Sequence, residues 1–144
     1  SIKVRNPECT RPWQHVLEPL SGYLLLGQKL LEGLPEFANA WNFGPAIESN
    51  MKTVDIIDMM AVRWNAISAE IAINKEAPHE AGLLMLDSSK AKMQMGWEPV
   101  WEIETTIEKT VDWYREYIEK GRAITKDQIE KYINDAISKE IIWA

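Results

Sequence analysis

A short stretch near the start of the chain gathers the residue types best suited to hold an anionic ligand. Arg5 and Asn6 are followed closely by Arg11, Trp13 and His15, and two X-Pro steps in the same stretch favour turns. Arginine presents a planar fork of donors that matches phosphate oxygens, and an indole can stack on another ring. The alternative, surface arginines beside a core tryptophan, is about equally well supported. Residue chemistry alone therefore supports a binding region rather than an active site.

Other chemistry finds little support in the sequence. The only histidines are His15 and His79 and the only cysteine is Cys9, so we expect no metal centre. His79 beside Glu80 has the residue types of an acid–base pair, although a loop histidine is more often simply solvated. Asp87 precedes an expected helix, which favours capping over catalysis. Glycine-rich nucleotide fingerprints and Tyr-x-x-x-Lys do not occur in the sequence, and we therefore predict no catalytic residue.

Composition narrows the choice of partners. The chain has 144 residues, 46% of them hydrophobic and 26% charged, with a net charge of −6 and a pI near 5.0. These values favour one globular domain, and the acidic balance disfavours nucleic acid or an anionic membrane as partner. One cysteine and no long apolar run favour a cytoplasmic location. Because the chain begins at Ser1 rather than Met, we expect a piece of a longer protein.

The element with the clearest pattern is a helix over residues 19–32. Pro19 opens it, and Gly33 followed by Pro35 closes it. Its leucines cover about half of the helical wheel, and Gly27 lies within that apolar arc. We therefore expect this helix to require substantial cover from another element.

The remaining elements alternate between helices and short strands. Thr53 is expected to cap a helix through residue 64, and Asp87 opens a short helix that ends at Gly96. T-x-x-E and T-x-x-Q patterns at Thr105 and Thr125 predict capping boxes for two further helices, the first stopped by Gly121. Short extended pieces are expected within 1–16 and at 41–43, 70–73 and 83–86. The fold class is mixed α/β and helix-rich.

Several motifs together resemble a known family. The chain resembles the C-terminal portion of CDP-glucose 4,6-dehydratases, of the extended short-chain dehydrogenase/reductase superfamily, most specifically in R-P-W-Q-H-V-L-E-P at 11–19. Further matches occur in the same order: W-N-F-G-P at 41–45, P-H-E-A at 78–81, L-D-S-S-K-A at 86–91, G-W-E-P at 96–99 and K-T-V-D-W-Y at 109–114. The G-W-x-P and T-V-x-W-Y motifs also occur more widely among sugar-nucleotide dehydratases and epimerases.

The resemblance implies a two-part enzyme. In that family an N-terminal domain holds NAD and a catalytic Tyr-x-x-x-Lys, and a smaller C-terminal region binds the sugar nucleotide. The enzyme oxidises C4 of the glucosyl unit, eliminates water across C5 and C6, and returns the hydride to C6, which yields CDP-4-keto-6-deoxyglucose for surface polysaccharide. Residues 1–144 would be the substrate-binding region without the NAD-binding domain. We thus expect this chain alone to bind no NAD and to be inactive.

The resemblance also implies site residues. The nucleotide pocket would be lined by Lys3, Val4, Arg5 and Asn6, with Arg11 on the diphosphate or ribose, His79 near the phosphates and Asn42 as a further polar contact. Gly82-Leu83 stands where family members often have His-Tyr or a similar polar pair. This departure concerns the contacts expected at the phosphate end of the ligand.

The expected partners follow from the same comparison. CDP-glucose is the expected ligand, and the helix over 19–32 would dock on the NAD-binding domain. Without that cover, we expect self-association or a rearranged helix. The alternatives are another nucleotide-sugar dehydratase or epimerase, or a non-catalytic binding module that uses the same fold.

Overall fold

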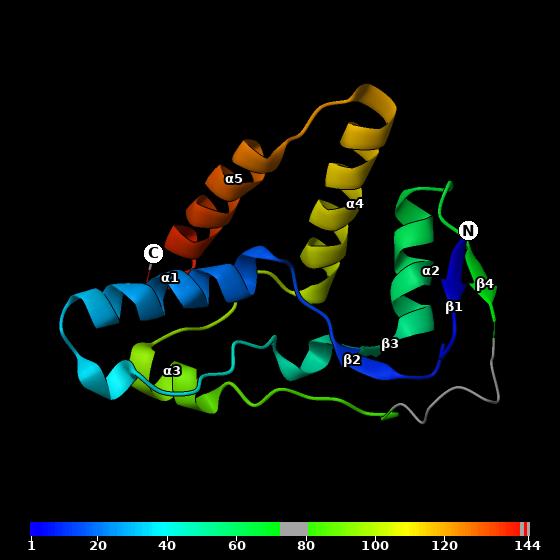
Figure 1. The fold of residues 1–144 in the computed structure, drawn as a ribbon. Helices are drawn as coiled ribbons and strands as arrows, with labels where there is room; N and C mark the ends of the chain where they lie inside the picture. The colour runs from blue at the N-terminus through cyan, green and yellow to red at the C-terminus, as the bar shows by residue number, and fades with distance from the viewer. Residues whose placement is uncertain (73–80, 142, 144) are drawn as a thin grey trace.

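The computed structural model describes residues 1–72, 81–141 and 143, and within them the mixed α/β, helix-rich class is confirmed. In Figure 1, helix α1 (Leu17–Leu31) lies in the left half of the molecule, with α5 (Thr125–Ser138) above it and α4 (Ile103–Lys120) beside its N-terminal end. Helices α4 and α5 form the arms of an inverted V that closes at the turn over residues 121–124. Helix α2 packs against α4. In chain order the elements are β1 (Ile2–Val4), β2 (Thr10–Pro12), α1 (Leu17–Leu31), η1 (Pro35–Phe37), η2 (Ile47–Ser49), β3 (Asn50–Lys52), α2 (Thr53–Arg63), β4 (Ala69–Ile71), α3 (Ser89–Met95), α4 (Ile103–Lys120) and α5 (Thr125–Ser138).

Two small sheets bring distant segments to the chain's first residues. β1 pairs with β4 in parallel, with Ile2 opposite Ala69 and Val4 opposite Ile71. β2 pairs with β3 in antiparallel register. The extended pieces expected within 1–16 are confirmed. The strand expected at 70–73 is present as β4, but its side chains are exposed rather than half-buried, and Ile73 lies outside the described residues.

Two predicted strands are wrong. Residues 41–43 and 83–86 join no sheet in the described part of the chain, apart from one bridge between Thr10 and Leu83. The Gly44 N–H donates to Ser88 Oγ at 2.7 Å, so the two segments are held partly by a side chain. An apolar run signals burial, whereas a strand also needs a backbone partner at ladder distance. Phe43 is buried, but residues 83–86 are exposed.

The glycines predicted the C-terminal ends of helices correctly, whereas the threonines did not predict the N-terminal caps. Gly33, Gly96 and Gly121 have φ of +80°, +69° and +65°, the left-handed conformation that ends helices, as predicted. The threonine caps are wrong, because no side-chain cap bond forms at the start of α2, α4 or α5 and α4 already begins at Ile103. At α3 the N-cap is Ser88, which makes no side-chain cap bond, and Asp87 lies one residue earlier, where its Oδ1 accepts the Ser89 N–H at 2.9 Å.

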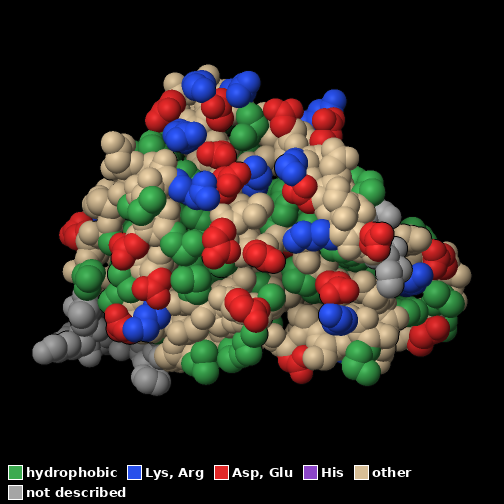
Figure 2. All heavy atoms as spheres, turned by 180° about the vertical axis from the view of Figure 1, so that it is seen from behind, with side chains coloured by type: hydrophobic (Ala, Val, Ile, Leu, Met, Phe, Trp, Pro, Cys, Tyr) green, Lys and Arg blue, Asp and Glu red, His purple; other side chains and the backbone are tan. Residues whose placement is uncertain are grey.

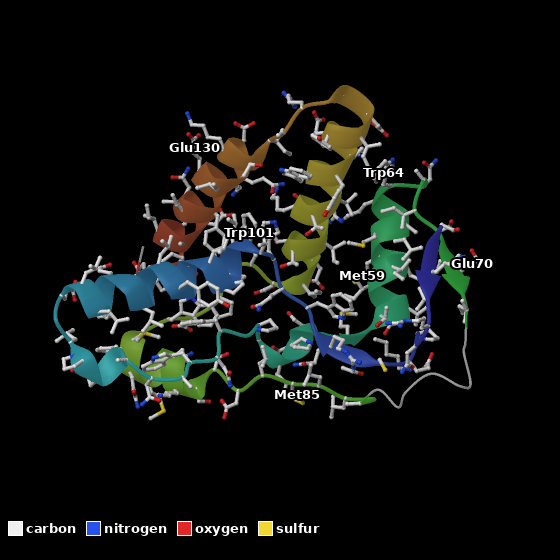
Figure 3. All side chains as sticks on the ribbon, viewed as in Figure 1. Met59, Trp64, Glu70, Met85, Trp101 and Glu130 are labelled. Carbon is white, nitrogen blue, oxygen red and sulfur yellow. The ribbon has the colours of Figure 1, made fainter. Side chains whose placement is uncertain are left out.

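Among the described residues, three apolar clusters form the core, and α1 contributes to two of them. Leu25 packs with Phe43 and Trp97, while Leu17 packs against the cluster around Trp101. A Cβ added to Gly22 would clash with the Phe43 ring, so this close approach requires glycine. The third cluster lies between α2 and α4, where Figure 3 labels Met59 and Trp64.

A buried carboxylate joins α1 to the loop before α4 and to α5. Glu18 has no exposed surface, and its carboxylate accepts the backbone N–H groups of Val100 at 2.9 Å and Trp101 at 2.8 Å. The Tyr132 hydroxyl donates to it at 2.7 Å. Burial raises the pKa of Glu18, and these three hydrogen bonds partly offset that rise. The periodicity of the sequence gives no sign of this network.

The outward face of α1 remains uncovered within the described structure. Leu31 is 92% exposed and Leu24 is 77% exposed, with Leu20 and Tyr23 also at the surface. A Cβ added to Gly27 would have open space around it, with no described atom of another element within 4 Å, so another backbone could approach there. The sequence-based expectation of an apolar arc that needs cover is therefore confirmed as an exposed face.

We expect the isolated chain to self-associate through this face, because each exposed leucine gains about 1.5–3 kcal/mol on burial. Leu24→Lys should reduce the apparent mass measured by light scattering at a given protein concentration. Gln94→Lys adds the same charge at an exposed position of α3 and should leave the mass unchanged. A monomeric wild-type chain would contradict the expectation.

Candidate functional site

Four of the cations and polar residues singled out in the sequence line one open pocket of about 290 Å³. β1, β2, the turn between them and the start of α2 supply its walls, at the edge of the molecule near the N-terminus (Figure 1). The lining includes Lys3, Val4, Arg5, Asn6 and Arg11, together with Cys9, Trp13, Thr53 and Ile57.

The turn between β1 and β2, which carries several of these residues, is held by hydrogen bonds from the start of α2. The Val54 N–H donates to the Pro7 carbonyl at 3.1 Å, and the Thr53 N–H donates to the Cys9 carbonyl at 3.0 Å. The Thr53 hydroxyl reaches the same Cys9 carbonyl at 3.3 Å. These bonds satisfy N–H groups that a helix start leaves without partners, and they fix the turn between β1 and β2. Asn6 and Arg11 are thereby held on one side of the pocket.

Positive charge dominates the pocket rim. Lys3, Arg5 and Arg11 are the charged side chains among the described lining residues, in a chain whose net charge is −6. Arg11 is half-buried, and its Nη1 donates to the carbonyls of Thr10 and Ala81, each at 2.9 Å. Those bonds orient the guanidinium from one side. Such a concentration of cations raises the local concentration of an anionic ligand.

The inner wall of the pocket is apolar. Cys9 and Ile57 are buried, and Trp13 is partly buried, with its Nε1–H donating to the Met51 carbonyl at 3.0 Å. Trp13 also packs on the cluster between α2 and α4, so it belongs to the core and to the pocket at once. An apolar wall beside a cationic rim suits a ligand with a ring at one end and phosphate at the other.

The structure separates the remaining candidate residues from this pocket. His15 is 5% exposed and lies edge-on to Trp101, with ring centroids 4.8 Å apart. Asn42 is exposed, and its amide donates to the Asp87 carbonyl at 3.3 Å, away from the lining residues. His79 lies outside the described residues. The sequence cluster thus divides, with Arg5 and Arg11 at the pocket and His15 at the start of α1.

Burial of His15 predicts a pH dependence of stability. Desolvation lowers its pKa from 6.5 to about 4, so the folded chain binds the proton more weakly than the unfolded chain does. The contribution of the neutral His15 to the free energy of unfolding is therefore fully present above pH 6.5. It is lost as pH falls towards 4, by on the order of 3 kcal/mol. Denaturant unfolding of the wild type and of His15→Gln measures this effect. The free energy of unfolding of the wild type relative to the variant should fall by that amount as pH is lowered from 6.5 to 4, whereas a constant difference would exclude the effect.

Four pocket residues escape the sequence reasoning, namely Ile2, Cys9, Thr53 and Ile57. Local patterns present Cys9 only as a possible metal ligand and Thr53 only as a helix cap. Ile57 stands among the apolar residues of its helix, with nothing to mark it as part of a site. The position of α2 against the turn between β1 and β2 depends on long-range pairing, and no local pattern reports it.

Metal and membrane sites find no support in the described part of the chain. No three His, Cys, Asp or Glu side chains gather there in a way that could hold a metal ion. None of its helices combines the length and apolarity needed to cross a membrane. On the face shown in Figure 2, acidic and basic side chains are interspersed with hydrophobic ones.

Fold and pocket together define a class: a mixed α/β chain with a cationic pocket at the turn between two short strands. A comparison with known proteins is more particular. The chain is 42% identical over 136 residues to the CDP-glucose 4,6-dehydratase of Salmonella typhimurium strain LT2, and the match spans 92% of this chain. The resemblance to CDP-glucose 4,6-dehydratases predicted from the motifs is confirmed.

The match covers only part of the relative's length. The chain spans 38% of the length of that dehydratase, a share consistent with a C-terminal portion. No protein-family model matches the chain.

Proposed function

We propose that this chain is the sugar-nucleotide-binding region of a CDP-glucose 4,6-dehydratase. One observation carries the proposal: five residues assigned to the nucleotide site by motif position, Lys3, Val4, Arg5, Asn6 and Arg11, line a single cationic pocket. The 42% identity to a CDP-glucose 4,6-dehydratase supports the choice of ligand. CDP-glucose carries a ring and a diphosphate, which match the apolar wall and the cationic rim.

Each residue has a distinct part in this proposal. Arg11 binds a diphosphate oxygen through its guanidinium, whose Nη1 is oriented by the Thr10 and Ala81 carbonyls. Lys3 and Arg5, both exposed at the rim, neutralise the remaining phosphate charge. Val4 and Asn6 contact the nucleoside. Asn42 and His79 are secondary candidates that would reach the ligand from other segments.

The pocket holds only part of the substrate. Its volume of about 290 Å³ is at the lower edge of the roughly 300–1,000 Å³ of typical ligand sites, and a dinucleotide does not fit in it. NAD would therefore be bound by another part of the whole enzyme, which would also supply the catalytic Tyr-x-x-x-Lys. The exposed face of α1 is the proposed docking surface for that part.

The ligand assignment is tested by titrating the 144-residue chain with CDP-, UDP-, GDP- and dTDP-glucose in a calorimeter. Preferential binding of the cytidine sugar is expected. Equal affinity for all four would remove the cytidine assignment, and preference for another base would favour a different nucleotide-sugar enzyme.

Catalysis by the chain alone is tested separately. We expect no 4-keto sugar when the chain is incubated with CDP-glucose and NAD. Formation of that product would show that residues 1–144 contain the complete active site.

A further inference from the structure

A second cavity, of about 450 Å³, opens where α4, α5 and the first residues of α1 meet. Trp113 and Tyr114 line this V cavity from α4, Thr125 and Gln128 line it from α5, and residues 14–17 complete it. The Trp113 Nε1–H donates to Thr125 Oγ1 at 2.8 Å and so ties the two arms of the inverted V together (Figure 1). The V cavity shares no lining residue with the cationic pocket.

The exposed face of α1 leads into the V cavity. Leu17 lines the cavity, and Val16, which is 63% exposed, lines it from just before the helix. Leu20, Leu24 and Leu31 follow Leu17 at spacings of three, seven and fourteen residues, which place them on the same side of the helix. These three are exposed leucines of α1. The α1 face and the V cavity therefore form one continuous surface.

Helix α4 adds an exposed apolar wall to this surface. Tyr114 lines the V cavity and lies on the same helical face as the buried Ile107 and Val111, yet it is 54% exposed. Ile118 lies one turn further along that face and is 64% exposed. The apolar side of α4 thus continues beyond the part that the described core covers.

The combined surface carries no charge where it is deepest. Of the described residues that line the V cavity, none is Asp, Glu, Lys or Arg. Burial lowers the pKa of His15 to about 4, so its imidazole is neutral at physiological pH. A charged group placed in the cavity would lose hydration without gaining a counter-charge. The occupant must therefore present uncharged apolar side chains.

The length of the relative indicates which occupant is available. The chain spans 38% of the length of the Salmonella typhimurium dehydratase, so most of a protein of that length lies outside these 144 residues. Contiguous apolar surface that is left exposed marks a site of interaction with another protein part. The proposed function already requires such a part, because the cationic pocket cannot hold NAD.

The position of the V cavity also suits that part. Arg11 and Trp13 line the cationic pocket, and the next residue, Gln14, lines the V cavity. The Trp13 N–H donates to the Ser49 carbonyl at 3.1 Å, and Gln14 Nε2 donates to the Phe43 carbonyl at 3.0 Å. The segment between the two sites is thereby fixed. Whatever fills the V cavity is consequently held at a set position relative to the pocket.

We propose that the V cavity is the socket for uncharged apolar side chains of the NAD-binding part of the same polypeptide. The docking surface then extends from the α1 leucines across the V cavity to Tyr114, instead of ending on α1. The inference rests on the proposed function, which assigns NAD to a part outside residues 1–144. Its consequence is that docking sets the position of NAD relative to the nucleotide-sugar pocket.

Thiol labelling of single-cysteine substitutions tests this surface. Leu24→Cys reports on the α1 face, Tyr114→Cys on the V cavity, and Met93→Cys on an 84% exposed position of α3 outside the surface. Each is labelled in the 144-residue chain, diluted until light scattering shows a monomer, and in the longer protein that contains it. Peptide mass spectrometry assigns the label to its position, and the native Cys9 is buried.

We expect labelling at Leu24→Cys and Tyr114→Cys to be about tenfold slower, or more, in the longer protein, and labelling at Met93→Cys to agree within about twofold. Protection of Leu24→Cys without protection of Tyr114→Cys would overturn the socket and leave docking on α1 alone. Equal protection of Met93→Cys would also overturn it, because the effect would not be confined to this surface. None of these results depends on the titration with CDP-glucose, which tests the proposed function separately.

A filled cavity provides the second test. Thr110 lines the V cavity, whereas Thr105, on the same helix and also partly buried, does not. In the longer protein Thr110→Phe should restore fast labelling at Leu24→Cys, because the filled socket no longer accepts its occupant. Thr105→Phe should leave Leu24→Cys protected. Continued protection in Thr110→Phe, with circular dichroism unchanged, would show that docking does not use the V cavity.

Discussion

Replacing Glu18 with alanine is expected to lower the free energy of unfolding by about 3–5 kcal/mol, the largest single-residue effect on stability that we predict. The change leaves the N–H groups of Val100 and Trp101 without an acceptor inside the core, and it leaves the Tyr132 hydroxyl with only its longer bond to Ser21 Oγ at 3.2 Å. A buried donor left unpaired costs about 1–3 kcal/mol. The three segments tied together by the carboxylate would also lose their common anchor.

Chemical denaturation followed by tryptophan fluorescence measures this effect. Glu18→Gln keeps the volume and one acceptor oxygen, so its loss should be intermediate. Glu32→Ala, at the exposed end of the same helix, should lie within about 0.5 kcal/mol of the wild type. A Glu18→Ala protein as stable as the Glu32→Ala protein would show that the carboxylate does not hold the core together.

The Glu18 carboxyl group also gives a signed pH dependence. Because burial raises its pKa in the folded chain, the folded state binds this proton more tightly than the unfolded state. The associated stability is complete below the unfolded-state pKa of about 4.5 and is lost as pH rises through the folded-state value. The pH dependence from Glu18 is opposite in sign to that from His15. The wild type must therefore be compared with Glu18→Gln for the first effect and with His15→Gln for the second.

Arg11→Ala should weaken binding of CDP-glucose by about 1.5–3 kcal/mol, which corresponds to about 10- to 150-fold in Kd. Arg11 is the half-buried cation of the pocket, and two carbonyls orient it before the ligand arrives. A preoriented guanidinium loses less entropy on binding a phosphate than an exposed lysine does. Its removal should therefore cost more than removal of Lys3 at the exposed rim.

Two variants separate the role of Arg11 in binding from its role in folding. Arg11→Lys retains the charge but not the planar fork of donors. We therefore expect its affinity for CDP-glucose to lie between those of the wild type and Arg11→Ala. Arg122→Ala removes an arginine that pairs with Glu116 at 2.8 Å, far along the chain from the pocket, and should bind like the wild type. Unchanged affinity in Arg11→Ala, with the fold intact by circular dichroism, would remove Arg11 from the site.

Local sequence signals determined the helices of this protein. The apolar arc after Pro19 and the glycines at positions 33, 96 and 121 predicted α1 and the ends of α1, α3 and α4 correctly, because hydrophobic periodicity and positive φ are properties of neighbouring residues. The motifs also indicated the family resemblance and most of the pocket residues, since β1, β2 and their turn are contiguous in the chain.

Tertiary structure alone decided the rest. The division of the Arg5–His15 cluster between the cationic pocket and the start of α1 depends on where β3, α2 and α5 pack, and these elements lie far away in sequence. Residues 41–43 and 83–86 have the composition of strands, but a strand exists only where a backbone partner lies at ladder distance. In the sequence, Glu18 is an ordinary charged residue of a first helical turn. Only the fold places its carboxylate within reach of three buried donors, because hydrogen bonds across a core depend on contacts that local periodicity does not encode.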